Sequence, residues 1–262
     1  TILQVISMPR VLLLHGNGGS RTRFLPLMDW LSSHAPEIQV TLPDLSGFDG
    51  RPLPAGGATW DTFVAEVAES VGPHATDEWV VYGHGIGGSL LMEWAARDYR
   101  LPGGAQLTPK RVILHSVIGA SLQKRWFPKL MRPLFMRWLI WKLVTFRPLQ
   151  KRWERRLFLQ PDRIPQALRD QFFEDYRHCR AFAVFFDLIT PAWYRRVQPR
   201  LSQEPFIFWW GEKERVVQAR YLDLWRADFP AAQFLLEPTW DHFPMLDQPE
   251  EFAQKFVTLI TQ

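Results

Sequence analysis

The sequence of 262 residues lacks several features that would place it in other classes of protein. It has one cysteine, Cys179, so no disulfide can form within the chain, and we expect a reducing compartment or a fold that needs no disulfide. No run of eighteen or more apolar residues occurs, which argues against a transmembrane helix. The first ten residues, TILQVISMPR, do not have the pattern of a secretory signal peptide. These absences predict a cytoplasmic protein.

Patterns for metal and dinucleotide binding are also absent from the sequence. The seven histidines show no H-x-x-x-H spacing and no cysteine-rich motif accompanies them, so no metal site is expected. The stretch GHGIGG has glycines at 83, 85, 87 and 88, which is not the G-x-G-x-x-G spacing of dinucleotide-binding folds. We therefore predict no cofactor.

Positive charge is concentrated in one part of the chain. Residues 121–200 carry 18 Lys and Arg against 6 Asp and Glu, whereas the rest of the chain carries 13 against 21. The same stretch holds five tryptophans, and basic residues interleaved with aromatic ones suit either a solvated helix face or an anionic lipid surface. Nucleic-acid binding is not expected, because the rest of the chain is acidic and no nucleic-acid-binding motif is present.

Short apolar runs alternate with segments of helical periodicity on both sides of this basic stretch. Strands are predicted at 11–15, 39–43, 78–83, 111–116, 205–211 and 233–237, and helices at 21–33, 60–72, 88–99, 218–229 and 249–262. This alternation indicates an α/β fold with a mostly parallel sheet flanked by helices. The basic stretch interrupts the pattern, so we expect one core domain from residues 1–120 and 201–262, with a helical insertion at 121–200.

The stretch YGHGIGGSL, residues 82–90, follows one predicted strand and leads into a helix. Its residues 83–87 have the frame G-x-S-x-G, which presents a nucleophilic serine on a sharp strand-to-helix turn. Here the nucleophile position is Gly85. Glycine relieves the backbone strain of such a turn, but it has no side chain that can attack a substrate. Ser89 would lie inside the following helix and cannot replace the missing serine.

Three further signals follow other predicted strands. HGNGGS, at 15–20, is a glycine-rich turn whose backbone N–H groups can face an anion. Glu214 comes just after the strand at 205–211, and His242 lies in the loop between the last strand and the last helix. A carboxylate in such a place can hold the N–H of a histidine ring, and the histidine can accept a proton from a nucleophile. Four signals in this order, each at a strand end, predict a shared site.

In these four motifs the chain resembles the α/β-hydrolase superfamily, from about Val11 onward. The resemblance implies an α/β-hydrolase fold in which Gly85 occupies the nucleophile position. It further implies that His242 is the catalytic histidine and Glu214 its acid, where aspartate is more usual. The insertion at 121–200 resembles the cap of the family, which closes over the pocket and sets specificity.

The resemblance also assigns the oxyanion hole. The backbone N–H groups of Asn17 and Ile86 would form the oxyanion hole, with Gly18 as a further donor. Candidate substrate-binding residues are His84, Trp138 and Trp141.

Some features depart from the family pattern. Only ten residues precede the strand that begins at Val11, so we expect a sheet shortened by a strand or more. No carboxylate follows the strand at 111–116, where some members place the acid, and this favours Glu214. Ser116 is conceivable as a pocket hydroxyl. Asp241 would point away from the site in an extended loop, so it is a helper at most.

The missing nucleophile leaves three interpretations open. The chain is an inactivated carboxylic ester hydrolase with a Ser-His-Glu triad, a non-catalytic ligand-binding or interaction protein on the same fold, or an enzyme in which His242 is the base of another reaction. We favour the first, because Glu214, His242 and the oxyanion loop keep matching places. The expected substrate is a hydrophobic ester or acyl compound. The basic insertion is a candidate for peripheral contact with an anionic membrane, and the sequence does not indicate an oligomeric state.

Overall fold

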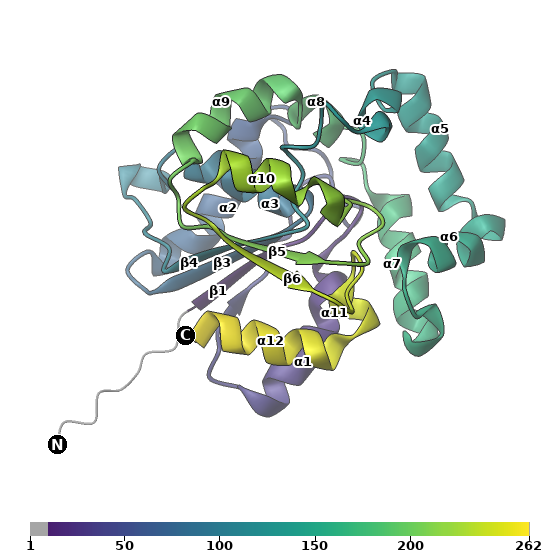
Figure 1. The fold of residues 1–262 in the computed structure, drawn as a ribbon, viewed down its shortest axis with the longest axis horizontal. Coiled ribbons are helices and arrows are strands. Elements are labelled where there is room, and N and C mark those ends of the chain that lie inside the picture. Colours follow the sequence, from purple (N-terminus) through teal and green to yellow (C-terminus); the bar gives the residue numbers. More distant parts are fainter. Residues whose placement is uncertain (1–9, 262) are drawn as a thin grey trace.

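A sheet of parallel strands forms the centre of the structure, a computed structural model that describes residues 10–261 (Figure 1). Its strands are β1 (Arg10–Leu14), β2 (Val40–Thr41), β3 (Trp79–His84), β4 (Arg111–His115), β5 (Ile207–Gly211) and β6 (Gln233–Glu237). They are ordered β2-β1-β3-β4-β5-β6, and every neighbouring pair is parallel. The predicted parallel sheet is confirmed, and the carboxyl ends of its strands share one edge.

Helices cover both faces of this sheet (Figure 1). One layer contains α2 (Trp60–Val71), α3 (Ile86–Ala95), α9 (Pro191–Leu201) and α10 (Leu222–Asp228), and the other contains α1 (Leu25–His34) and α12 (Pro249–Thr261). Successive side chains of a strand point to opposite faces, so each strand serves both layers. In β1, Leu12 and Leu14 join the core under α2 and α3, whereas Val11 and Leu13 join the core under α1 and α12.

Several predicted elements are shorter in the structure than in the sequence pattern. The strand expected at 39–43 is reduced to the two residues of β2, at the edge of the sheet. The helix expected at 88–99 is α3, which ends at Ala95, after which Asp98 and Tyr99 adopt left-handed backbone conformations that a helix does not contain. The apolar periodicity continued past the point where the backbone turns.

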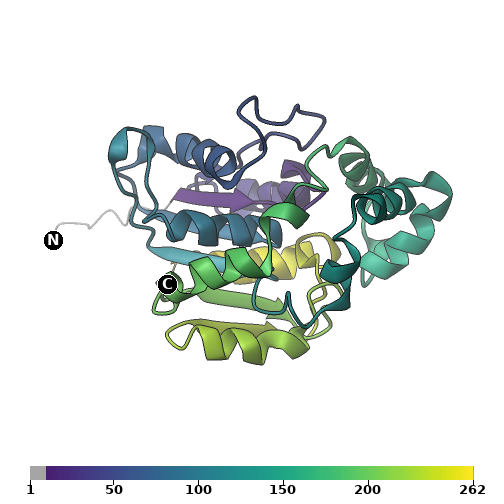
Figure 2. The ribbon, with the colours of Figure 1, turned by 90° about the horizontal axis from the view of Figure 1, so that it is seen from above.

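The segment between β4 and β5 is mainly helical. It contains α4 (Trp126–Leu130), α5 (Leu134–Thr145), α6 (Gln150–Leu157), α7 (Gln166–His178), α8 (Phe185–Leu188) and α9. Viewed from above, α4 to α7 lie beyond the carboxyl ends of the strands (Figure 2). In contrast, α9 packs on α3, where the side chains of Trp193 and Arg196 both donate to the buried Glu93. The predicted division at residue 200 stays a prediction, and the contacts of α9 join it to the helix layer of the sheet.

No helix within residues 10–261 is both long enough and apolar enough to cross a membrane.

Candidate active site

Gly85 forms the sharp turn between β3 and α3. Its backbone has φ +56° and ψ −115°, a conformation that a residue with a Cβ adopts only under strain. The Gly85 N–H donates to the carbonyl of His115 at the end of β4, over 2.9 Å. This hydrogen bond fixes position 85 at the carboxyl edge of the sheet, between two central strands.

The glycines around this turn meet different surroundings. A Cβ on Gly83 would lie 2.5 Å from the carbonyl carbon of Gly87, and a Cβ on Gly87 would lie 2.6 Å from the carbonyl oxygen of Leu14. Both glycines are therefore required by the close approach of the backbone. At Gly85, a Cβ would meet no atom beyond its chain neighbours closer than the Cα of Gly16, at 3.7 Å. Position 85 therefore has room for a Cβ, although its backbone conformation would be strained.

Glu214 and His242 are brought together from two neighbouring strand ends. Glu214 follows β5, and His242 lies between β6 and the short helix α11 (Pro244–Asp247). The Nδ1 of His242 is 2.7 Å from the Oε2 of Glu214, and both side chains are buried. Nδ1 therefore carries the proton that faces the carboxylate. In the neutral ring, Nε2 is then the nitrogen without a proton and can accept one.

Further donors surround the Glu214 carboxylate. The Ser116 hydroxyl donates to Oε2 over 2.7 Å, and the N–H groups of Val216 and Val217 donate to Oε1 over 2.6 and 2.9 Å. Burial alone would raise the pKa of Glu214, but the charge of His242 and these hydrogen bonds outweigh it and lower the pKa to about 2. Glu214 is thus ionised over the whole range in which histidine titrates. The sequence did not link Ser116 to the acid, because only the fold brings them together.

A second link joins the loops that carry this pair. Asp241 accepts hydrogen bonds from the backbone N–H of Arg215 (3.0 Å) and of His242 (2.8 Å), and it forms an ion pair with the Arg215 guanidinium. Asp241 therefore holds the backbones of Arg215 and His242 together. This matches the helper role expected from the sequence.

His84 lies behind His242. Its Nε2 donates to the carbonyl oxygen of His242 over 2.9 Å, and the two ring centroids are 4.6 Å apart. Burial, together with the neighbouring His242 and His115, lowers the pKa of His84 well below its usual value, so its ring is neutral. The observed contact supports the His242 loop, and the predicted role of His84 in substrate binding stays a prediction.

Two backbone N–H groups near Gly85 have no hydrogen-bond acceptor in the described part of the chain. One belongs to the glycine-rich turn after β1. Within residues 10–261, the N–H of Asn17 donates to no other protein group, and the N–H of Ile86 has no acceptor because Ile86 begins α3. The N–H of Gly18 is engaged by the Asn17 side chain over 3.0 Å, so the structure removes Gly18 from the set of free donors. Asn17 is held in turn by the carbonyl of Phe182, over 3.0 Å.

The two predicted tryptophans of the insertion have different surroundings. Trp141 is half-buried, and its Nε1 donates to the carbonyl of Tyr176 over 2.9 Å, which ties α5 to α7. Trp138 is 55% exposed and stacks on Phe135 of the same helix. Neither contact involves a residue of the Glu214 and His242 loops, so their roles in substrate binding stay predictions.

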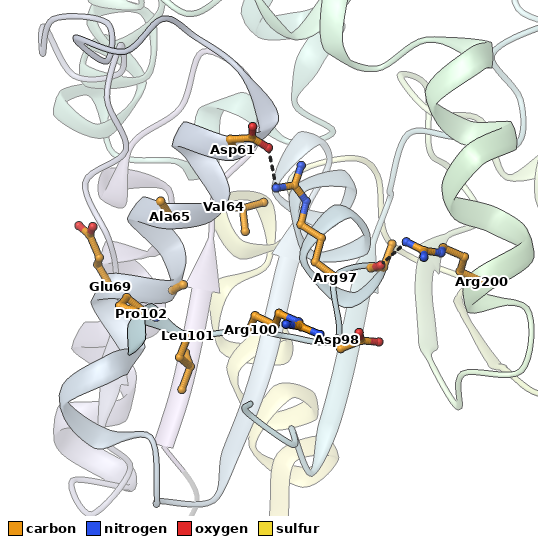
Figure 3. A pocket seen from close by; sticks show the side chains of 12 residues that line it. Asp61, Val64, Ala65, Glu69, Arg97, Asp98, Arg100, Leu101, Pro102 and Arg200 are labelled. Carbon is orange, nitrogen blue, oxygen red and sulfur yellow. Dashed lines mark hydrogen bonds and ion pairs between the residues drawn. The ribbon is translucent and has the colours of Figure 1, made fainter. Parts of the chain in front are cut away.

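A separate open hollow of about 630 Å³ lies at the other end of α3 (Figure 3). Three of its six charged side chains are already engaged: Arg97 pairs with Asp61 and also with Glu93, and Arg200 donates to the carbonyl of Ala96. It is remote from Gly85, because α3 separates the two along its length. The strand-end cluster is therefore the candidate site for chemistry.

A sequence model described as the Alpha/beta hydrolase family matches residues 11–255. The chain belongs to this family. The predicted superfamily and fold are thereby confirmed, and the coarse assignment as a hydrolase-family protein follows.

Individual members of the family are only distantly similar to the chain. A protein of Mycobacterium tuberculosis designated as a hydrolase, LipZ, is 25% identical over 279 residues, which cover 96% of this chain and 88% of LipZ. The enol-lactonase from Burkholderia xenovorans LB400 has a TM-score of 0.71 at 18% identity, over 97% of this chain and 92% of its own. The esterase EaEST from Exiguobacterium antarcticum has a TM-score of 0.70 at 16% identity, over 98% and 93%. At these identities the structural likeness shows the fold alone.

Proposed function

We propose that this chain is a carboxylic ester hydrolase of the family in which glycine stands in place of the nucleophilic serine. The proposal rests on one observation, which is the combination of backbone conformation and free space at Gly85. Position 85 has the strained backbone of a nucleophile turn and open space for a Cβ, while the adjacent glycines have none. A turn built only for close packing would not require that space.

A hydroxyl at this position would act together with four other groups. With a hydroxyl at position 85, His242 would accept the hydroxyl proton as the oxygen attacks the ester carbonyl. The ionised Glu214 would stabilise the resulting imidazolium, and the N–H groups of Asn17 and Ile86 would hold the negative oxygen. His242 would then pass the proton to the departing alcohol, and water would release the acid by the same steps in reverse order.

As it stands, the chain is expected to bind acyl compounds and to turn them over very slowly. Removing the serine of such a triad lowers turnover about a millionfold, and the oxyanion donors and binding retain about 10³–10⁴-fold over water. The apolar side chains of the insertion favour a hydrophobic ester or acyl compound. We place the chain with the esterase-like members of the family on these grounds.

The test is the substitution Gly85→Ser. It adds the one group that the set lacks, so turnover of simple activated esters such as p-nitrophenyl butyrate should rise by several orders of magnitude. A fluorophosphonate should then label the protein at residue 85, which mass spectrometry of the peptides would locate. Neither signal is expected from the chain with Gly85.

Two matched variants separate chemistry from folding. Gly85→Ser combined with His242→Ala should return to background, because the hydroxyl would have no base. Gly85→Ala introduces the same backbone strain of about 1–3 kcal/mol without a hydroxyl, so it should gain no activity. If Gly85→Ser folds but remains silent on esters, thioesters and lactones, the hydrolase proposal is wrong and a ligand-binding protein on the same fold becomes the better account.

A further inference from the structure

The outward face of α5 is mostly apolar, which is unusual for a surface helix. Leu134, Phe135 and Trp138 are 73%, 63% and 55% exposed. At 3.6 residues per turn, these three side chains and Lys142 fall within an arc of about 100°. On another side of the same helix, Arg137 is buried. A helix at a protein surface normally turns its polar side chains to water and its apolar ones inward.

The apolar exposure extends beyond α5 on both sides. Trp126 in α4 is 70% exposed, and Phe146, which follows α5, is 55% exposed. Nine large apolar side chains are exposed in the described part of the chain, and six of them lie within residues 126–146. The helices α4 and α5 lie beside each other in the insertion (Figures 1 and 2). We call this the α4–α5 surface, formed by Trp126, Leu134, Phe135, Trp138, Leu143 and Phe146.

Only positive charge accompanies this surface along the chain. No Asp or Glu occurs between residues 99 and 153. Four basic residues of α4, α5 and their flanks are exposed and form no ion pair within residues 10–261: Lys124, Lys129, Arg132 and Lys142. The buried Arg137 differs, because it pairs with Asp187 through two contacts of 2.5 and 2.7 Å. The exposed cations are therefore left for an external anionic partner.

We propose that the α4–α5 surface docks on an anionic lipid bilayer. Aromatic and aliphatic side chains would enter the boundary between headgroups and acyl chains, while the lysines and arginine beside them would meet lipid phosphates. A second copy of this chain fits less well, because a symmetric contact would bring these unpaired cations against their own counterparts. The helices would lie on the membrane and not cross it.

Docking in this way would bring the carboxyl edge of the sheet toward the bilayer, because the insertion extends from that edge (Figure 2). A lipid-like ester would then reach the site from the membrane and not through water. This consequence rests on the proposed function, whereas the docking itself does not.

The experiment measures binding of the purified chain to vesicles by flotation, which needs no enzymatic activity. Vesicles of phosphatidylcholine alone are compared with vesicles of phosphatidylcholine mixed with phosphatidylglycerol. We expect binding to the anionic vesicles that weakens as salt is added, because salt screens the headgroup charge. Equal and negligible binding to both kinds of vesicle would overturn the proposal.

Two double variants locate the contact. Lys129→Gln with Lys142→Gln should lower the partition coefficient to anionic vesicles about thirtyfold, from about 1 kcal/mol for each cation. Phe135→Ser with Trp138→Ser should lower it about tenfold or more, since both side chains lose their apolar contact. The matched controls are Arg100→Gln, an exposed cation beside the hollow of Figure 3, and Leu53→Ser with Leu236→Ser, which are 40% and 38% exposed elsewhere.

The controls should bind as the unaltered chain does, and all variants should keep its circular dichroism spectrum. If the controls weaken binding as much as the α4–α5 variants, the attraction is diffuse and the proposed surface is wrong. Light scattering during gel filtration covers the remaining outcome. A dimer that the Phe135 and Trp138 variant dissociates, with no vesicle binding, would make this surface a contact between copies and would also overturn the proposal.

Discussion

The residues around His242 divide into those that hold its ring and those that hold its backbone. Glu214 contacts the ring, while His84 and Asp241 bind the carbonyl oxygen and the N–H of the same residue. Each of these partners is itself buried, so water does not compete for these hydrogen bonds. The orientation of His242 is therefore determined at three points before any ligand arrives.

Ser116 is the residue of this group whose role is most easily isolated. In a Gly85→Ser background, Ser116→Ala should lower kcat about tenfold and leave KM nearly unchanged, because Glu214 loses one of its charge-assisted hydrogen bonds. Ester kinetics at neutral pH provide the measurement. The matched control is Ser121→Ala, which removes a buried hydroxyl that has no hydrogen-bond partner within residues 10–261. Equal losses in the two variants would assign Ser116 a packing role only.

The order of motifs in the sequence was enough to predict Gly85, Glu214 and His242 as candidate site residues, because each follows the end of a strand. It could not reveal the contact of Ser116 with Glu214, which depends on a left-handed backbone conformation of Ser116 after β4. It also could not show that the Gly18 N–H is engaged, since that bond comes from a side-chain rotamer of Asn17. Residue types and their spacing predict which residues belong to the site, whereas the fold determines which hydrogen-bond donors remain free.

At the scale of elements, the insertion is attached to the His242 loop through α11. The buried Asp247 at the end of α11 accepts the backbone N–H groups of Leu159 and Gln160, over 3.0 and 3.1 Å. In a second contact the insertion supplies the acceptor: the Arg215 guanidinium donates to the carbonyl of Arg155 in α6. These hydrogen bonds join the end of α6 and the residues that follow it to the loops that carry Glu214 and His242.

Asp247→Ala should loosen this attachment. The amides of Leu159 and Gln160 would lose their acceptors, so their hydrogen exchange should become faster, while amides of the central strand β3 keep their rates. Exchange followed by NMR or mass spectrometry would show the difference. The exposed Asp162, in the turn before α7, supplies the control: Asp162→Ala should leave both sets of rates unchanged. Unchanged exchange in Asp247→Ala would mean that other contacts hold the segment.

Element positions were predicted better than element ends. Short, continuous apolar runs located each strand of the sheet. Strands of a parallel sheet are buried on both faces, so nearly all of their residues are apolar. The periodicity could not assign α9, because its apolar face would suit either a cap helix or a sheet layer. The contacts of Trp193 and Arg196 with Glu93 decide that question, and these residues lie a hundred positions or more from their partner.

At the scale of the whole molecule, buried histidines set the response to acid. Burial lowers the pKa of His15 to about 4, that of His115 to about 3, and that of His84 well below 6.5. Such a histidine binds fewer protons when folded than when unfolded, so unfolding takes up protons below about pH 6.5. Asp247, whose pKa burial raises to about 6, acts in the opposite sense between about 6 and 3.8, but it is one group against three.

We therefore expect the free energy of unfolding to fall as pH is lowered from 6.5 toward 4. Below about pH 4.5, protonation of Glu214, whose folded pKa is about 2, should destabilise the fold further. Urea unfolding at a series of pH values would measure the slope. A stability that stays constant from pH 7 to 5 would contradict the neutral state of the buried histidines.

The pairing of α1 with α12 has a consequence for synthesis on the ribosome. Phe24 and Leu27, before and within α1, share one core with Phe252 and Phe256 of α12. At about 5–20 residues per second, translation separates the two halves of this core by on the order of ten seconds or more. During that time the apolar side of α1 and of β1 faces water without its cover. The nascent chain should therefore depend on chaperones that shield this face until residues 249–261 emerge.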